Sequence, residues 1–433
     1  MSSFRRPSRS PAAAAPLDDE DLLSEILLRL PPQPSSLPRA SLVCKRWCCL
    51  VSDPRFLRRF RRHHRRNPPL LGFFFEEVIP ARGISFVPTL EPPNRVPVGR
   101  FSLQFDDGDR YRLLNCRHGL VLILFGKHNQ ALVWDPVNGD QHRVAVPPSF
   151  YMAAPTRVRG AVLRPAGDIR HFQVVLIGTH KEQHKPGIAC VYSSETKEWG
   201  NLVSTPLPPE NSIYSFRTIV YRGMACVLVG NCLYWLLSER SALILEFDLD
   251  MQRLAVIHAP VDIGANSNCH FSVMRAEGGG LGFLFLSDFN AQIWSRKKDC
   301  DAAVSWVLRR TVQLDKLLPL KQGMGVVPLI LLLLGLAEDN NVLFLMADAG
   351  IFMVQLESLQ FKRLSKISFW RHLHPFETVY TAGNSTPLHS ARTKKNTKKK
   401  PGMLLTSFRV KLTISCSVLH QLFLLLLDDL FII

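Results

Sequence analysis

A histidine pair, a cysteine pair and a glycine run are the residues whose type and spacing could carry chemistry. His180 and His184 lie four residues apart, which would place two metal ligands on one face of a helix. Their neighbours are polar and include a proline, as in a loop between strands, so we expect no metal there. Cys48 and Cys49 lack a nearby base to activate a thiolate. The glycines at 278–280 precede no helical pattern, which favours a turn over a phosphate-binding loop.

The sequence contains none of the common catalytic motifs. There is no GxSxG elbow, Walker loop, HExxH helix or Rossmann glycine fingerprint. A hydrolase whose carboxylates converge in a central channel stays open as an alternative, because one sequence does not locate such residues. We expect a non-catalytic protein with no metal and no cofactor.

Cysteine usage and the N-terminal residues indicate the compartment. Ten cysteines are spread along the chain without a CxxC pair, which argues against a structural zinc module. Residues 1–16 are rich in Ser, Pro, Ala and Arg and lack the apolar core of a secretory signal. Disulfide frameworks belong mainly to secreted chains. We therefore expect free thiols, a disordered segment at 1–16, and a location in the nucleus and/or cytoplasm.

The basic charge of the chain is concentrated at its two ends. The formal net charge is +17, from 53 Lys and Arg against 36 Asp and Glu. Residues 1–66 contribute +8 and residues 385–433 contribute +6, which leaves +3 for the 318 residues between them. Such ends could attract nucleic acid, an anionic surface or an acidic partner. The body of the chain is nearly neutral.

Two apolar runs are too short to cross a bilayer. Residues 326–336 and 418–427 are each closed by a pair of acidic residues. A transmembrane helix needs about 20 consecutive apolar residues. We expect no membrane span.

The elements that must position any functional residue begin with a helix. Acidic residues at 18–21 favour a helix start through capping and the helix dipole. Apolar residues then recur at helical spacing and form one face: Leu22, Leu23, Ile26, Leu27 and Leu30. Pro31 and Pro32 end this helix, because the residue before a proline avoids the helical conformation.

Two further helices are predicted to follow. The second starts at Ser35 or Ser36 and has one apolar side, made of Leu37, Ala40, Val43, Cys44 and Trp47. The third has Ser52 as its candidate cap and buries Phe56, Leu57 and Phe60. Three helices within about 45 residues bury too little surface to be stable alone. We expect this module to need a partner.

Three blocks in this region closely resemble an F-box. They are DEDLLSEILLRLP at 19–31, SLVCKRW at 41–47 and SDPRF at 52–56, in the order and at the spacing of that family. The resemblance covers about residues 17–60 and implies docking on a Skp-family adaptor and, through it, on a cullin. By resemblance, the residues at or beneath the adaptor surface are Leu17, Leu22, Leu23, Ile26, Leu27, Pro31, Leu37, Val43 and Trp47. An amphipathic face of this kind suits a helix-in-groove contact, although each residue could instead only pack the helices together.

A basic stretch follows the three blocks. Residues 55–66 contain seven arginines, a pattern found in nucleic-acid patches and nuclear-import signals. The other interpretation is the solvated face of the third helix and a linker. Plant F-box proteins, which this chain resembles, often carry such a run. We favour the solvated face, since a basic run alone is a weak signal.

From residue 70 to residue 383 the pattern changes to short apolar segments separated by Gly, Pro, Asn and Asp, which is typical of strands. A unit of three or four strands recurs at spacings of 58, 55, 47 and 60 residues. Its aligned positions are Trp134, Tyr192, Phe247, Trp294 and Val354. Repeats of this length indicate β-propeller blades. A sandwich or two small barrels is the alternative.

An added first blade at 73–105 brings the expected number to about six. Residues 374–376 and 379–380 could supply the strand that pairs the last blade with the first. The phrases NCRHGLV at 115–121 and GLAED at 335–339 resemble the propeller-type F-box-associated domain of plant F-box proteins. The expected fold is therefore a small all-α F-box of three helices followed by an all-β domain, a β-propeller of about six blades.

The expected domains are a disordered N-terminus (1–16), an F-box (17–62), a linker (63–72), a propeller (73–383) and an atypical or disordered tail (384–433). The resemblance implies a substrate-recognition subunit of a Skp–cullin–F-box ubiquitin ligase, with loops of the propeller binding an unknown protein substrate. The alternative is a basic nucleic-acid-associated regulator that uses the charged N- and C-terminal segments. We expect neither nucleic acid nor a membrane as the main partner.

Overall fold

The computed structural model describes residues 19–77, 83–106, 108–153, 155, 157–165, 170–180, 186–207, 226–237, 243–261, 269–298, 304–319, 331–347, 350–365 and 372–381. These residues belong to one compact unit. The sequence predictions for residues 1–16, Leu17, His184 and the tail at 384–433 concern residues that are not among those described. Within them, no helix is both long and apolar enough to cross a membrane.

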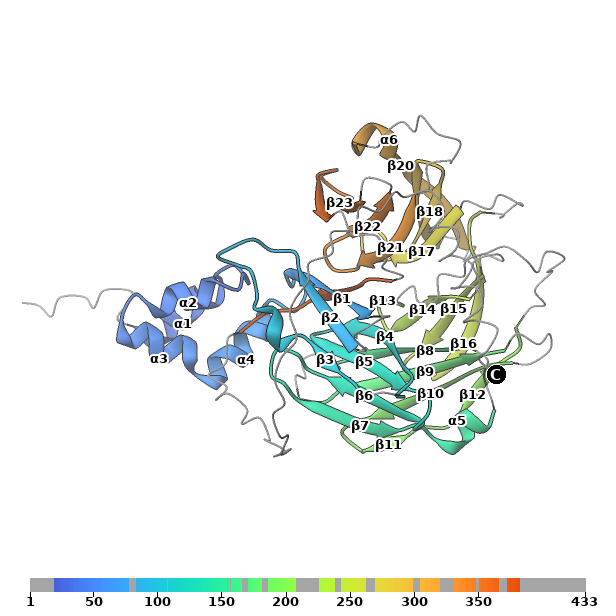
Figure 1. Cartoon of the computed structure of the whole chain (residues 1–433), viewed down its shortest axis with the longest axis horizontal. Coiled ribbons are helices and arrows are strands. Elements are labelled where there is room, and N and C mark those ends of the chain that lie inside the picture. Colours follow the sequence, from blue (N-terminus) through green and yellow to red (C-terminus); the bar gives the residue numbers. More distant parts are fainter. Residues whose placement is uncertain are drawn as a thin grey trace, which may run out of the picture. The chain divides into compact units, whose positions relative to one another are not determined.

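The N-terminal residues that the structure describes, from Asp19 on, form four short helices, where three were expected (Figure 1). They are α1 (Glu20–Leu28), α2 (Ser36–Ser41), α3 (Lys45–Ser52) and α4 (Pro54–His63). The predicted second helix is divided because α2 tightens at its end. There, the N–H groups of Leu42 and Val43 donate to carbonyls three residues earlier, and Cys44 then has an extended backbone. Val43 and Cys44 therefore leave the face that Leu37 and Ala40 bury.

In the described part of the chain, the strands form six antiparallel sheets, the blades of a β-propeller. Blade 1 contains β25 (His374–Glu377), β1 (Leu70–Glu77), β2 (Gly83–Pro88) and β3 (Leu103–Gln104). Blade 2 contains β4 (Tyr111–Arg117), β5 (Leu120–Phe125), β6 (Gln130–Trp134) and β7 (Gln141–Ala145). Blade 3 contains β8 (Arg157–Leu163), β9 (Gln173–Thr179), β10 (Gly187–Ser193), β11 (Glu198–Trp199) and β12 (Val203–Thr205).

Blade 4 contains β13 (Val227–Val229), β14 (Cys232–Leu236), β15 (Leu243–Asp248) and β16 (Arg253–His258). Blade 5 contains β17 (Cys269–Arg275), β18 (Leu281–Ser287), β19 (Asn290–Lys298) and β20 (Val304–Gln313). Blade 6 contains β21 (Leu332–Ala337), β22 (Val342–Ala347), β23 (Gly350–Gln355) and β24 (Phe361–Ser365). The connections include η2 (Val98–Arg100), α5 (Pro148–Met152) and α6 (Leu314–Leu317). The propeller starts at Leu70, three residues before the expected boundary.

The ring is closed by a strand from the far end of the chain. In β25, His374 pairs with Phe74 and Pro375 pairs with Phe73 of β1, so residues 374–376 supply the closing strand as predicted. The expectation that residues 379–380 also belong to a strand is wrong. Val379 instead packs among the helices α1 to α4, because the chain leaves the sheet after Glu377.

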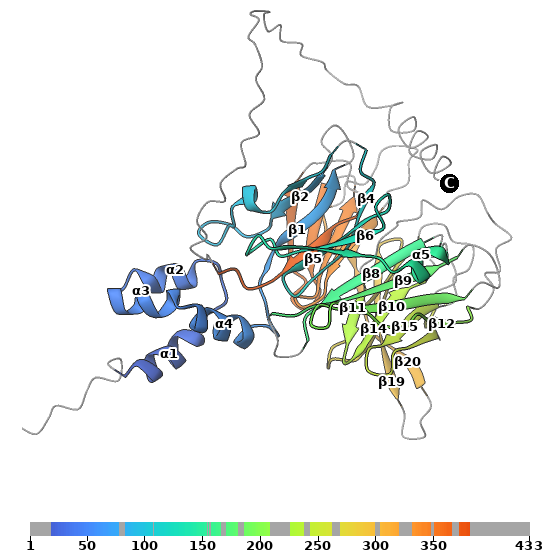
Figure 2. The ribbon, with the colours of Figure 1, turned by 90° about the horizontal axis from the view of Figure 1, so that it is seen from below.

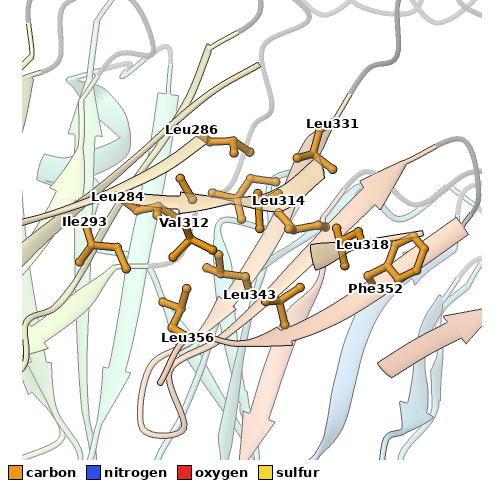
Figure 3. Close-up of a cluster of buried hydrophobic side chains, with 14 of the residues drawn as sticks. Leu284, Leu286, Ile293, Val312, Leu314, Leu318, Leu331, Leu343, Phe352 and Leu356 are labelled. Carbon is orange, nitrogen blue, oxygen red and sulfur yellow. The ribbon is translucent and has the colours of Figure 1, made fainter. Parts of the chain in front are cut away.

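The core consists of one apolar cluster between each pair of neighbouring blades. In β5, for example, Val121 and Ile123 pack against blade 1, while Leu120 and Leu122 pack against blade 3. Figure 3 shows the cluster between blades 5 and 6, to which Leu284 of β18 and Leu343 of β22 both belong. Because every sheet is covered on both faces, its strands are apolar at consecutive positions. This arrangement excludes the sandwich and the two small barrels.

Other expectations about the repeat are confirmed. The five aligned positions each lie in the third strand from the centre of a blade: Trp134, Tyr192, Phe247, Trp294 and Val354. The glycine run at 278–280 forms the turn between β17 and β18, and Gly278 and Gly279 have φ angles of +92° and +85°. Residues that carry a side chain rarely adopt such φ angles, which explains why glycine occupies these two positions.

Candidate functional site

Two aspartates cap the first and last helices of the N-terminal module, α1 and α4; Figure 2 shows these helices. The Asp19 carboxylate accepts hydrogen bonds from the N–H groups of Asp21 at 2.9 Å and Leu22 at 3.1 Å. Asp53 accepts one from the N–H of Arg55 at 2.8 Å. These bonds satisfy donors that a helix leaves unpaired at its N-terminus. The expected cap Ser52 is the last residue of α3 instead.

The residues predicted for the adaptor surface fall into two groups. Leu23, Leu27 and Leu37 are buried and form the core of the module together with phenylalanines of α4. Four side chains are exposed: Leu22, Ile26, Pro31 and Val43. Trp47 is half-buried, and Leu17 lies outside the described residues. That these residues contact an adaptor stays a prediction.

The exposed apolar side chains lie on α1 and in the connection from α2 to α3. Leu22 and Ile26, one turn apart on α1, are 42% and 38% exposed. In the connection, Leu42 is 84% exposed and Val43 is 61% exposed. We call Leu22, Ile26, Leu42 and Val43 the apolar surface. Leu42 was not among the predicted site residues, since its exposure follows from the break between α2 and α3.

A second candidate is a cluster of charges where the inner strands β4, β17 and β21 end. Glu338 accepts hydrogen bonds from Arg117, from Arg275 at 2.8 Å and from the N–H of Leu228 at 3.0 Å. Arg117 also donates to the carbonyl of Cys226 at 2.7 Å. Burial raises the pKa of Glu338, and the two arginines oppose that shift. The cluster joins blades 2, 4, 5 and 6.

The closing strand adds a half-buried carboxylate, that of Glu377, beside this cluster. Glu377 accepts hydrogen bonds from the N–H groups of Asp339 at 3.1 Å and Asn340 at 2.8 Å. Burial, and then the charge of Asp339, raise the pKa of Glu377 to about 7. Burial lowers the pKa of His374 in the same strand to about 4. A small cavity is lined by these groups and by Arg117.

Two buried thiols of the propeller are not activated as nucleophiles. Burial raises the pKa of the thiols of Cys190 to about 12 and of Cys226 to about 11, so both are poor nucleophiles at neutral pH. Among the residues that the structure describes, no group of three His, Cys, Asp or Glu could hold a metal ion. The arginines and carboxylates of the cluster form ion pairs across the blades, while the buried Nε of Arg117 makes no hydrogen bond within the described structure.

Two family models match the chain. The F-box domain matches residues 19–59. The family described as F-box protein AT5G49610-like, beta-propeller, matches residues 112–382, which is more than half of the chain. The chain belongs to this family of F-box propeller proteins. F-box domains generally bind a Skp-family adaptor and serve substrate recognition in ubiquitin ligases, and members that join an F-box to this propeller are typically non-catalytic adaptors.

The solved structures that match this F-box protein are only distantly similar to it. One is a protein of unknown function from Bacteroides caccae, with 11% identity, a TM-score of 0.38, and coverage of 70% of this chain and 98% of that chain. Another is the β-propeller domain of Cps50 (Swd1) from Myceliophteria thermophila, with 11% identity, a TM-score of 0.35, and coverage of 66% and 80%. No curated protein sequence matches the chain.

The F-box is joined to the propeller by the segment that follows β25. Val379 is buried in the F-box core beside Leu23 and Phe60. The Arg61 guanidinium donates to the hydroxyl of Thr381 at 3.0 Å. The closing strand of the propeller therefore continues directly into the core of the F-box.

Two further contacts fix the F-box on the blades. Arg65 donates to the carbonyls of Pro165, at 2.6 Å, and of Arg164 in the connection between β8 and β9. The Ser35 hydroxyl donates to the Asn94 side chain at 2.7 Å, in the connection between β2 and β3. Part of the basic run at 55–66 thus holds the two domains together. A role of this run in nuclear import or nucleic-acid binding stays an untested alternative.

Proposed function

We propose that this chain is the substrate-recognition subunit of a plant Skp–cullin–F-box ubiquitin ligase. In this proposal the F-box docks on the Skp-family adaptor and the propeller binds a protein substrate. The observation that carries it is the apolar surface, which lies on a domain matched by the F-box family. The protein acts in the nucleus and/or cytoplasm and performs no covalent chemistry itself.

The apolar surface supports the proposal because it cannot be buried within the module. The module core is already filled by Leu23, Leu27 and Phe60, which are nearly inaccessible to solvent. Leu22 and Ile26 point outward from the same helix, at the spacing that a helix presents to a groove. Full burial of an exposed leucine or isoleucine contributes about 1.5–3 kcal/mol, and the gain scales down for Leu22 and Ile26, which are 42% and 38% exposed.

The propeller supports the second half of the proposal as a scaffold. Its blades are rigid sheets whose cores are closed on both faces. Binding residues in such proteins are usually on the connections between strands. The charge cluster at Arg117 and Glu338 is internally paired, so we assign substrate binding to the connections and edges of the blades and not to that cluster.

Co-purification with a Skp-family adaptor and a cullin tests the proposal. The double variant Leu22→Asp with Ile26→Asp places charge on the apolar surface and should reduce adaptor recovery at least about tenfold. Leu23→Asp would be a poor test, since Leu23 is fully buried and its replacement would unfold the module.

The matched control is Met251→Asp, an exposed apolar side chain in the turn between β15 and β16. It should leave adaptor recovery unchanged. Equal recovery of the adaptor with the wild type and the double variant would overturn the proposal. A cellular function that persists in a variant unable to bind the adaptor would favour the basic, nucleic-acid-associated regulator.

A further inference from the structure

The structure separates the arginines of residues 55–66 into those with a partner and those without. Arg59 pairs with Glu25 of α1 at 2.5 Å. Arg61 and Arg65 hold the propeller through the contacts described above. The remaining four are exposed: Arg55, Arg58, Arg62 and Arg66. Among the residues that the structure describes, no carboxylate pairs with any of these four guanidinium groups.

Three of the exposed arginines form one line along α4. Arg55, Arg58 and Arg62 are separated by three and four residues, so their side chains lie on the same side of the helix. We call these three residues the arginine stripe. Phe56 and Phe60 lie on the opposite side of α4 and are buried in the F-box core. The core therefore holds the helix with the arginine stripe toward solvent.

The arginine stripe is unfavourable for the helix that carries it. Like charges three or four residues apart on a helix repel each other. Arg55 also lies in the first turn of α4, where the helix dipole disfavours a cation. Residues 54–66 contain no acidic side chain that could offset this repulsion. Carboxylates supplied by a partner would remove it.

The arginine stripe is continuous with the apolar surface on α1. Arg59 lies between Arg55 and Arg62 around α4, and its ion pair with Glu25 joins the two helices (Figure 2). On α1, Glu25 is one turn from Leu22 and directly precedes Ile26. Both side chains of the ion pair are about half exposed, at 49% and 52%. One partner can therefore cover apolar side chains on α1 and cations on α4 together.

A protein suits this combined surface better than a nucleic acid does. Single strands stack their bases on exposed aromatic side chains, whereas Phe56 and Phe60 of α4 are buried. A phosphate backbone would also leave the apolar Leu22 and Ile26 uncovered. A second copy of this chain would bring two stripes of like charge together, which is unfavourable. The surface thus favours a protein with carboxylates beside apolar side chains.

From this arrangement we propose that the Skp-family adaptor carries an acidic segment that lies against the arginine stripe. Its carboxylates pair with the stripe while neighbouring apolar side chains cover Leu22 and Ile26. The inference rests on the proposed function, to which it adds the chemistry of the partner beside α4. Exposed ion pairs of this kind contribute little affinity, and they mainly accelerate association by steering the partner.

Association kinetics of the full-length chain with a purified Skp-family adaptor test the proposal. For the wild type, the association rate constant should fall at least about tenfold between about 50 mM and about 500 mM NaCl, because salt screens exposed charges. Arg55→Glu with Arg58→Glu and Arg62→Glu should lower the rate constant at the lower salt concentration at least about tenfold. This variant should also lose most of the salt dependence.

Two further variants complete the comparison. Arg55→Gln with Arg58→Gln and Arg62→Gln removes the charge without reversing it, and its rate constant should be intermediate. The matched control reverses three exposed arginines of the propeller, Arg110→Glu, Arg253→Glu and Arg363→Glu, and so changes the net charge equally. Its rate constant should stay within about twofold of the wild-type value.

The outcomes separate this inference from the proposed function. Equal rate constants for the glutamate stripe variant and the control would overturn the inference and leave the adaptor role intact. No adaptor binding by the wild type would overturn both. A single-stranded RNA oligonucleotide that binds the wild type but not the stripe variant, with adaptor association equal in the two, would assign the arginine stripe to nucleic acid instead and overturn the inference.

Discussion

At the scale of single residues, the buried charges connect segments that are far apart in the sequence. Arg117 ends β4 in blade 2, and Glu338 follows β21 in blade 6. These residues belong to the two phrases that resemble the F-box-associated propeller, at 115–121 and 335–339. The resemblance therefore marks two halves of one ion pair. Removing one partner of such a buried pair typically costs about 3–5 kcal/mol.

Glu377 should make stability depend on pH in a defined window. Its pKa is about 7 in the folded chain, against an ordinary value of 4.5. The unfolded chain therefore releases this proton at lower pH than the folded chain. Consequently, the contribution of Glu377 to the free energy of unfolding falls as the pH rises from 4.5 to about 7 and is constant above that.

The variant Glu377→Gln should lack this dependence. Urea unfolding of both proteins across the window should show that the variant gains stability relative to the wild type as the pH rises. The difference between the two proteins is the quantity to follow, because His374, whose pKa is lowered to about 4, acts in the opposite direction in both. Parallel stability curves would contradict a raised pKa of Glu377 in the folded chain.

At the scale of elements, the sequence predicted strands better than helix boundaries. Consecutive apolar residues such as Leu120 to Ile123 indicate strands that are covered on both faces, and the structure places them so. The break between α2 and α3 carried no comparable signal. Leu42 and Val43 are apolar, which suggests that they continue a buried face, whereas the local backbone exposes them. Of these two residues, Val43 was assigned to the adaptor surface only through the F-box resemblance, and Leu42 was not predicted at all.

The segment after β25 should stabilise the F-box helices selectively. Val379→Ala removes two methyl groups from the core around Leu23 and Phe60 and should lower the free energy of opening of α1 and α4 by about 2 kcal/mol. Hydrogen exchange of the full chain would show this as faster exchange in α1 and α4, with the amides of β5 and β18 unchanged.

A suitable control for that experiment is Val98→Ala, since Val98 is exposed in η2 between β2 and β3. It should leave exchange in both domains unchanged. If Val379→Ala left the F-box amides protected as in the wild type, the F-box core would not depend on this segment. If it loosened both domains equally, the effect would not be selective for the F-box.

At the scale of the whole molecule, ring closure determines which parts of the chain are needed for the fold. The repeat at 47–60 residues predicted five blades, and an added first blade brought the expected number to about six, the number in the described structure. The closing strand was predicted at 374–376, but its continuation into the F-box was not, because it depends on contacts between segments more than 300 residues apart, such as Arg61 with Thr381. Such contacts leave no periodic pattern in either segment.

Two truncations should separate the closing strand from the tail. A chain that ends at Leu373 lacks β25, which leaves an unpaired edge on β1 and removes Phe376 from the core between blades 1 and 2. A chain that ends at Thr381 keeps both β25 and Val379 and lacks only residues 382–433.

The shorter chain should melt at least about 10 °C below the full-length protein and should bind a dye specific for exposed apolar surface. The chain ending at Thr381 should melt like the full-length protein, because every described contact is retained. Equal melting of the two truncated chains would contradict ring closure by β25, and a large loss of stability in the longer one would mean that the tail is part of the fold.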